Sequence, residues 1–271
     1  MGVVIVVQAR TASTRLPGKV LLPAAGRPLL ALMLERVRAA RRAQHVVVAT
    51  TTAPEDRAIA ELCQQIGVEF YCGHPTDCLD RHYQVGLRSG ADAVAKIPSD
   101  CPLIDPAAID RVLETFLAAP GAFDYVSNLH PATWPDGNDV EVMSMRALSE
   151  AANEADDAFD REHTTPFIWS RPERYALKNV TWETGLDYSK TRRLVLDWAE
   201  DYAVIHEVFE TLRPRSGAVF DLASILQLLA DRPELAARNA RHLGYSHLAS
   251  RPALARTSIA AARSQRAEHG R

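Results

Sequence analysis

The sequence predicts an α/β fold in which a mixed, mainly parallel sheet is flanked by helices and carries a small inserted lobe. Two observations lead to this prediction. Short apolar runs alternate with stretches of helical periodicity along residues 3–127, which is the pattern of repeated strand–helix–strand units. From about residue 130 the alternation stops, and turn-rich sequence leads into a hairpin or a mixed-sheet strand. We therefore expect one domain over residues 1–250, with a lobe inserted at about residues 130–190.

The predicted strands are short and rich in branched side chains. The first, residues 3–7, is the unbroken run VVIVV, as expected for a central strand that is covered on both faces. The remaining strands are expected at residues 46–50, 68–71, 93–97 and 124–127, as a strand pair within residues 169–182, and at residues 193–196.

The predicted helices repeat apolar residues three and four positions apart. Residues 28–41 are the first example, with Leu29, Leu32, Met33 and Val37 on one face. Further helices are expected at residues 55–66, 76–89, 106–118, 147–154, 200–212, 222–230 and 233–243. The Ala- and Arg-rich tail, residues 251–271, is interpreted as either helical or disordered.

The composition excludes several classes of protein. A formal net charge of −3 argues against nucleic-acid binding, which is usually accompanied by a strongly basic domain. No apolar run approaches the roughly 20 residues that span a bilayer, and the first residues do not resemble a secretory signal. The four cysteines lack C-x-x-C spacing, which indicates reduced thiols in a cytoplasmic protein.

The loop after the first strand is the clearest functional feature. Residues 8–19, QARTASTRLPGK, place Arg10, Arg15 and Lys19 within ten positions. Fixed cations at the end of a buried strand can hold a triphosphate and neutralise the charge of a leaving pyrophosphate. The spacing is neither that of a P-loop nor that of a dinucleotide-binding loop. The alternative is a solvated basic turn, which the fixed turn at Pro17 and Gly18 disfavours.

Two aspartates follow apolar runs and are candidate metal ligands. Asp100 lies in KIPSDCPLIDP after the strand at 93–97, and Asp197 closes the run at 193–196. Ligands of parallel sheets bind at the carboxyl ends of the strands, so both carboxylates can face the basic loop there. Mg²⁺ takes one or two such carboxylates together with phosphate oxygens. The alternative for Asp100 is a turn or helix cap, and Asp105 and Asp201 are interpreted as helix-terminus residues.

Two polar segments form a candidate acceptor site. DGNDVEV, residues 136–142, contains Asp139 and Glu141, and DREHTTP, residues 160–166, contains His163. Such groups can hydrogen-bond a polyol or pair with an acidic substrate, and a histidine can act as a general base. The alternative is a loop network that holds two surface segments together.

An ordered series of motifs resembles a known family. QARTASTRLPGK is similar to the Q-A-R-x-x-S-x-R-L-P-G-K motif of the SpsF-like cytidylyltransferases of spore coat polysaccharide biosynthesis. It is also similar to the opening loop of enzymes that activate keto-deoxy-octulosonate and acylneuraminate with CTP. The resemblance continues through VVVATT, GHPTDCLDRH, SDCPLIDP, DYVSN, PDGNDVEV, REHTTP and LVLDWAED, and covers about residues 3–240.

This resemblance implies a nucleotide-diphospho-sugar transferase fold of the glycosyltransferase-A (GT-A) type. It implies transfer of CMP from CTP to an acceptor oxygen, with release of pyrophosphate, and a homodimer paired through the lobe. The catalytic residues would be Arg10, Arg15, Lys19 and Asp100, and the Mg²⁺ ligands Asp100 and Asp197. The nucleotide would be bound by Gln8, Ala9, Arg10, Ser13, Arg15, Lys19, Thr50, Asp77, Asp80, Arg81 and Lys96.

The acceptor is expected to be an acidic sugar, a phosphate or a phosphonate. Its binding residues would be Asn128, Asp139, Glu141, Arg161, Glu162 and His163. The chain departs from the family's pattern at several places: Ser99 replaces a glycine, Lys96 an arginine, His82 a tyrosine, and a threonine of REHTTP a valine. The segment from Lys96 to Pro106 also lacks the glutamine that reads the base in the octulosonate enzymes.

Two other functions are compatible with the same fold. A glycosyltransferase that consumes a nucleotide sugar would need a D-x-D metal motif at a strand end, and the sequence has none beside the expected site. A nucleotide sensor of a surface-glycan pathway would bind CTP without turning it over.

Overall fold

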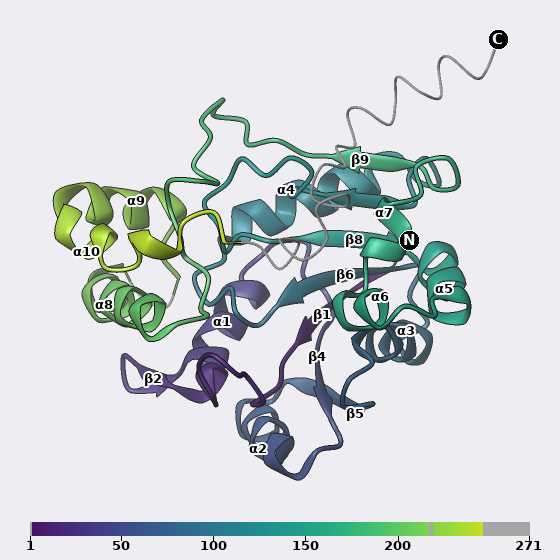
Figure 1. Cartoon of the computed structure of the whole chain (residues 1–271), viewed down its shortest axis with the longest axis horizontal. Helices are drawn as coiled ribbons and strands as arrows, with labels where there is room; N and C mark the ends of the chain where they lie inside the picture. The colour runs from purple at the N-terminus through teal and green to yellow at the C-terminus, as the bar shows by residue number, and fades with distance from the viewer. Residues whose placement is uncertain (1, 217–218, 246–271) are drawn as a thin grey trace.

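A seven-stranded sheet with helices on both faces forms the centre of the molecule (Figure 1). The computed structural model describes residues 2–216 and 219–245. The strand order is β5-β4-β1-β6-β8-β7-β9. The strands are β1 Val3–Gln8, β4 Val46–Thr51, β5 Glu69–Gly73, β6 Ala93–Pro98, β7 Tyr125–Ser127, β8 Glu141–Ser144 and β9 Leu177–Asn179. A separate small hairpin, which the sequence did not predict, joins β2 Pro23–Ala24 to β3 Arg27–Pro28.

The first half of the sheet is parallel, as predicted. Strand β1 lies between β4 and β6 and is parallel to both, and β5 extends this group on the outside. Strand β8 is antiparallel to both of its neighbours, so the sheet is mixed. The register pairs Gln8 with Pro98 on one side and with Ala49 on the other. The carboxyl ends of three strands therefore meet at one edge.

The helices divide into two groups that cover opposite faces of the sheet. The bounds are α1 Leu29–Arg38, α2 Arg57–Ile66, α3 Cys78–Arg88, α4 Pro106–Leu117, α5 Met145–Glu154, α6 Ala158–His163, α7 Pro166–Trp169, α8 Ala199–Ser216, α9 Leu222–Asp231 and α10 Pro233–Ala237. Short 3₁₀ turns are η1 Lys19–Leu21, η2 Pro54–Asp56 and η3 Ala240–His242. Helices α8, α9 and α10 gather at one edge of the molecule (Figure 1, left).

Strand β1 is buried on both sides because its side chains alternate between two cores. Ile5 and Val7 belong to the core that includes α1, α2, α4, α8 and α9. Val4 and Val6 belong to the core that includes α3, α5 and α7. All four side chains are at most 1% exposed. The unbroken VVIVV run is thus explained by a central strand, as predicted.

Three predicted elements were wrong. The strand pair expected within residues 169–182 is a single strand, β9, because helix α7 extends to Trp169 and hydrogen-bonded turns occupy the residues up to Tyr175. Residues 193–196 form no strand beyond an isolated bridge at Arg193. Their backbone instead bonds to neighbouring loops: the Leu194 N–H donates to the Asp136 carbonyl and the Leu196 N–H to that of Asp100. The helix expected over 233–243 ends at Ala237, and η3 follows it.

The tail predicted at residues 251–271 lies outside the described residues. Within the described ranges, no helix combines the length and the apolar composition that crossing a bilayer requires.

Candidate active site

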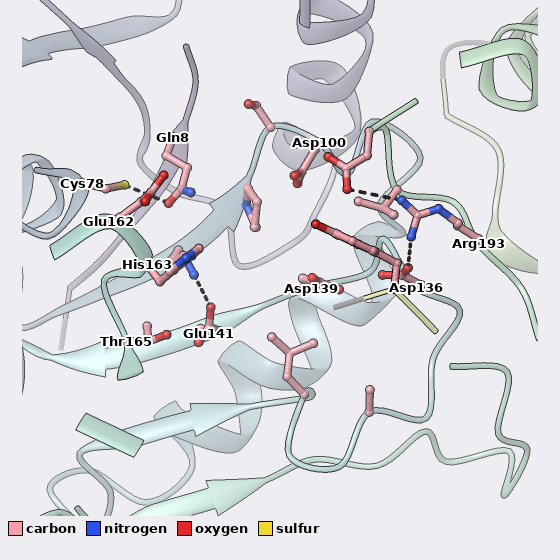
Figure 2. A pocket seen from close by; sticks show the side chains of 18 of the residues that line it. Gln8, Cys78, Asp100, Asp136, Asp139, Glu141, Glu162, His163, Thr165 and Arg193 are labelled. Carbon is pink, nitrogen blue, oxygen red and sulfur yellow. Dashed lines mark hydrogen bonds and ion pairs between the residues drawn. The ribbon is translucent and has the colours of Figure 1, made fainter. Parts of the chain in front are cut away.

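A cavity of about 900 Å³ opens at the carboxyl ends of β1 and β6. Its lining comes from the basic loop after β1, the segment after β6, the loop before β8, helix α6, and the segment before α8. Figure 2 shows two groups of side chains in it. One group contains Asp100, Asp136, Asp139 and Arg193, and the other contains Gln8, Cys78, Glu162, His163, Thr165 and Glu141.

The basic loop is folded back on itself by a buried aspartate that the sequence did not single out. Asp56 is 1% exposed, and its Oδ1 accepts hydrogen bonds from the Thr11 amide at 2.6 Å and the Thr11 hydroxyl at 2.7 Å. The Gly18 amide then donates to the Thr11 carbonyl at 2.9 Å, with Gly18 at φ +67°. The turn at Gly18 places Lys19 at the start of η1, where its side chain enters the cavity.

Lys19 lies between the two predicted metal ligands. Its Nζ is 3.0 Å from Oδ1 of Asp197 and 3.5 Å from Oδ2 of Asp100, and it donates to the Leu196 carbonyl at 2.6 Å. Since one ammonium contacts both carboxylates, Asp100 and Asp197 face the same point. The predicted convergence of the basic loop and the two acids is therefore present in the structure.

Arg15 also contacts Asp197, from the side that faces the cavity. Its Nη2 is 2.6 Å from Oδ1 of Asp197, and its Nη1 donates to the Tyr245 hydroxyl at 2.8 Å. The guanidinium lies 4.7 Å from the ring centre of Trp198 and 5.1 Å from that of Tyr245. Burial raises the pKa of the Asp197 carboxyl, but Lys19 and Arg15 outweigh burial and lower it.

Arg193 is a cavity-lining side chain that the sequence analysis missed. It is 3% exposed, and Asp201 accepts from its Nε at 2.9 Å and from its Nη2 at 3.1 Å. The same guanidinium lies 3.0 Å from Asp136 (Figure 2). It also lies 3.3 Å from Oδ2 of Asp197. Asp201 also accepts from the Asp197 amide, which confirms its predicted structural role. The sequence did offer a signal for this arginine. Arg193 precedes an apolar run and lies four residues before Asp197 and eight before Asp201.

The loop before β8 brings two more carboxyl groups into this half of the cavity. Burial raises the pKa of Asp136 to about 7; Arg193 opposes this, and Asp100 adds to it by like-charge repulsion. Burial, Asp136 and Asp100 raise the pKa of Asp139 well above its usual value. Gly137 has φ +101°, and a Cβ there would lie 2.6 Å from a main-chain carbonyl carbon, so the loop requires glycine.

A buried ionic network lines the other half. The Lys96 ammonium donates to Oε1 of Glu141, and the Tyr125 hydroxyl donates to Oε2 at 2.6 Å. Burial alone would raise the pKa of Glu141, but Lys96 lowers it to about 2. Burial alone would lower the pKa of Lys96, but the neighbouring Glu141 carboxylate outweighs burial and raises it. Both groups are therefore charged at neutral pH and are held in one position.

Cys78 and a strained turn complete this wall. Cys78 begins α3, and its thiol donates to Oε1 of Gln8 at 3.2 Å and lies 3.6 Å from Nδ1 of His82. Burial alone would raise the pKa of this thiol, but His82 and Arg81 outweigh burial and lower the pKa to about 6. Thr164, buried at φ +73°, centres a γ-turn in which the Thr165 amide donates to the His163 carbonyl. Such strain is concentrated at functional sites, and both flanking residues line the cavity.

Most of the predicted site residues line this one cavity. They are Gln8, Ala9, Arg10, Ser13, Arg15, Lys19, Arg81, Lys96, Asp100, Asp139, Glu141, Glu162, His163 and Asp197. Arg10 and Glu162 form an ion pair of 2.9 Å across it. Lining residues that the sequence did not single out include His130, Trp169, Lys190 and Tyr245.

Five predicted residues do not line the cavity: Thr50, Asp77, Asp80, Asn128 and Arg161. Thr50 is fully buried in β4. Asp77 caps α3 by accepting from the Asp80 amide and pairs with Arg161 at 3.1 Å. The side chain of Asn128 bonds to the backbone of the loop before β8 at two points, 2.7 and 3.0 Å. Asn128 and Arg161 therefore fit the alternative interpretation of these segments, a network of hydrogen bonds that holds loops together.

The two carboxylates beside Lys19, those of Asp100 and Asp197, fit a small, hard cation that also binds phosphate. Within residues 2–216 and 219–245, no group of three or more His, Cys, Asp or Glu side chains is arranged to hold a metal ion. Mg²⁺ does not need such a cage, because it keeps waters and binds one or two carboxylates plus substrate phosphates. Asp100 and Asp197, which face one point, have the right chemistry for that mode of binding.

The comparison with known proteins decides the family. The family model described as cytidylyltransferase matches residues 4–227. This chain belongs to the cytidylyltransferase family. A cytidylyltransferase from Leptospira borgpetersenii has a similar solved structure, with a TM-score of 0.81 and 28% identity over 87% of this chain and 97% of that one. The predicted fold, a nucleotide-diphospho-sugar transferase-like α/β fold, is confirmed.

Two relatives match this cytidylyltransferase over most of its length. An uncharacterized protein of Methanocaldococcus jannaschii is 32% identical over 240 residues, which cover 87% of this chain and 93% of that protein. The spore coat polysaccharide biosynthesis protein SpsF of Bacillus subtilis is 26% identical over 240 residues, covering 86% and 96%. The 3-deoxy-manno-octulosonate cytidylyltransferase of Trichlorobacter lovleyi is 38% identical over 124 residues, which are 45% of this chain. The SpsF-like resemblance predicted from the motifs is thus confirmed.

Proposed function

We propose that this cytidylyltransferase transfers CMP from CTP to an acidic sugar, phosphate or phosphonate, with Mg²⁺ as cofactor and release of pyrophosphate. The observation that carries the proposal is the contact of Lys19 with both Asp100 and Asp197 beside Arg15. A solved CMP-keto-deoxy-octulosonate synthetase in complex with CTP has the same fold, with a TM-score of 0.51 at 18% identity. The name of the Bacillus relative supports a role in polysaccharide biosynthesis.

The basic loop holds the part of the nucleotide that leaves. Arg10, Arg15 and Lys19 line one side of the cavity and bind the β- and γ-phosphates. As the acceptor oxygen bonds to the α-phosphorus, the bond to the bridging oxygen breaks and the charge on pyrophosphate increases. Three fixed cations stabilise this charge and hold the reactants in line. Asp100 and Asp197 would hold Mg²⁺, which supplies Lewis-acid stabilisation of the phosphate charge.

The acceptor lies against the wall that Glu141, Glu162 and His163 form. Glu141 and Glu162, with Asp139 from the other half of the cavity, offer acceptor oxygens for hydroxyl groups, and His163 takes the proton of the attacking hydroxyl. The salt bridge from Lys96 fixes Glu141, so this wall keeps its shape.

Substitution of the central lysine and aspartate tests the reaction. We predict that Lys19→Ala and Asp100→Ala each abolish Mg²⁺-dependent pyrophosphate release, measured with each nucleoside triphosphate and a panel of acidic and phosphorylated acceptors. Lys178→Ala, in β9 and outside the cavity lining, is the matched control and should retain the wild-type rate. Release at the wild-type rate in both cavity variants would contradict the proposal. A nucleotide sensor would bind CTP and release no pyrophosphate in any of these assays.

The homodimer implied by the family resemblance stays a prediction. Light scattering on the purified chain at micromolar concentration tests it, and a monomer there would refute it.

A further inference from the structure

Both carboxylate oxygens of Asp197 accept hydrogen bonds from cationic side chains of the chain itself. Oδ1 accepts from Arg15 at 2.6 Å and from Lys19 at 3.0 Å, and Oδ2 accepts from Arg193 at 3.3 Å. Asp100 shares Lys19, at 3.5 Å. The oxygens that would hold Mg²⁺ are therefore the oxygens that neutralise the basic loop.

The three cations differ in their freedom to move. Arg193 is 3% exposed and is fixed by Asp201 and Asp136 on its other edges. Arg15 and Lys19 come from the loop that lines the cavity, and their side chains are 36% and 11% exposed. If these two turn toward a ligand in the cavity, Asp197 keeps Arg193 as its partner, so its buried charge does not become unpaired.

Arg15 and Lys19 affect the two ligands in opposite ways: they repel the metal ion and attract the triphosphate. A divalent ion that approaches Asp197 meets two positive charges beside the oxygens it must bind, and like charges at this distance repel strongly. A triphosphate offers Arg15 and Lys19 new anionic partners of higher charge. Movement of these side chains toward the phosphates would expose the carboxylates to the metal.

We propose that Lys19 and Arg15 are internal counter-ions of Asp100 and Asp197, so that the triphosphate and the divalent cation bind cooperatively. This inference rests on the proposed function and adds to it a coupling between the binding of its two ligands. The chain alone holds a divalent cation weakly, and the triphosphate raises its affinity by drawing the two cations away. Because coupling is reciprocal, the cation raises the affinity for the triphosphate by the same factor.

The inference makes a counterintuitive prediction about Lys19→Met. This change should weaken CTP binding and at the same time tighten the binding of Mn²⁺ alone, by at least about tenfold, which is within the usual range of coupling between sites. The measurement is the paramagnetic resonance signal of free Mn²⁺ titrated with the full chain, without nucleotide. No catalytic turnover enters this measurement.

Matched variants keep the test decisive. Lys178→Met makes the same change outside the cavity lining and should leave Mn²⁺ binding as in the wild type. Asp197→Asn in the Lys19→Met background should remove the gained affinity. Arg15→Met is the second variant, should Lys19→Met fail to fold, and circular dichroism checks each fold.

The outcomes separate this inference from the proposed function. Folded Lys19→Met or Arg15→Met protein that binds Mn²⁺ no more tightly than the wild type would overturn the counter-ion role, even if the wild type releases pyrophosphate from CTP. Gained Mn²⁺ affinity in these variants, together with no pyrophosphate release by the wild type from any triphosphate, would support the counter-ion role and refute the proposed reaction.

Discussion

Asp201 holds the framework behind the carboxylate pair, and its removal should be costly. Its Oδ1 accepts from Arg193 and from Asn239, both at 2.9 Å. Its Oδ2 accepts from Arg193 at 3.1 Å and from the amides of Asp197 and Trp198, each at 3.0 Å. Asp201 itself is fully buried. Asp201→Ala therefore leaves several buried donors without their acceptor, one of them charged.

The size of the effect follows from these contacts. Removing one partner of a buried ion pair costs about 3–5 kcal/mol, because the other charge stays buried. Arg193 would keep Asp136 and Asp197 as partners, so we expect the lower end, about 3 kcal/mol. For a chain of this size that loss lowers the melting temperature by roughly 6–12 °C.

Urea denaturation followed by circular dichroism measures this loss. We expect a lower midpoint with an unchanged slope, since the surface exposed on unfolding does not change. Asp231→Ala is the control, because among the described residues that exposed carboxylate accepts a hydrogen bond from Gln227 alone, and it should cost less than about 0.5 kcal/mol. A loss of stability below about 1 kcal/mol for Asp201→Ala would refute the role of the Asp201–Arg193 ion pair in holding this framework.

Three further predictions concern the cavity walls. Since Lys96 lowers the pKa of Glu141 to about 2, their pair should contribute about 3 kcal/mol of stability above pH 4.5, lost as the pH falls toward 2. Gly137→Ala should destabilise the fold by more than about 2 kcal/mol in urea denaturation and lower activity, because its Cβ would collide with backbone. Iodoacetamide at pH 7 should alkylate Cys78, whose thiol lines the cavity and has a lowered pKa, and CTP should slow this alkylation by covering the thiol.

Each of these predictions has a control. Glu141→Gln should flatten the pH dependence of stability between pH 2 and 4.5, and an unchanged acid limb would show that the pair is not responsible. Gly121→Ala also has positive φ but meets no atom within 4 Å, so an equal cost would contradict the collision at Gly137. Peptide mass mapping distinguishes the cysteines, and alkylation of Cys78 at a rate that CTP leaves unchanged would contradict its place in the nucleotide cavity.

The central strands and the carboxylate pair could be predicted from local sequence. An unbroken run such as VVIVV requires cover on both faces, and the residue that follows such a run lies at the edge where ligands bind. Asp197 was found by the same reasoning although its apolar run is not a strand. That run is buried between loops, so its end still enters the cavity.

The remaining residues depend on contacts that local sequence does not encode. Arg193 pairs with Asp136, which is 57 positions away, and Arg15 contacts Tyr245, which is 230 positions away. Thr50 was misplaced because β4 is buried on both faces, and alternation then gives no indication of which side chains face the cavity. Arg161 and Asn128 are polar side chains in polar segments, and only the structure shows that they bond to backbone.

Calorimetric titration of the full chain with CTP and Mg²⁺ tests the central arrangement most directly. If Lys19, Asp100 and Asp197 together form a metal–triphosphate site, the wild type binds CTP in the presence of Mg²⁺, and Lys19→Ala and Asp197→Asn each weaken binding by more than about tenfold, the value of one lost charge-assisted contact. The Lys178→Ala control should bind as the wild type does. Equal affinity in all four proteins would contradict the account.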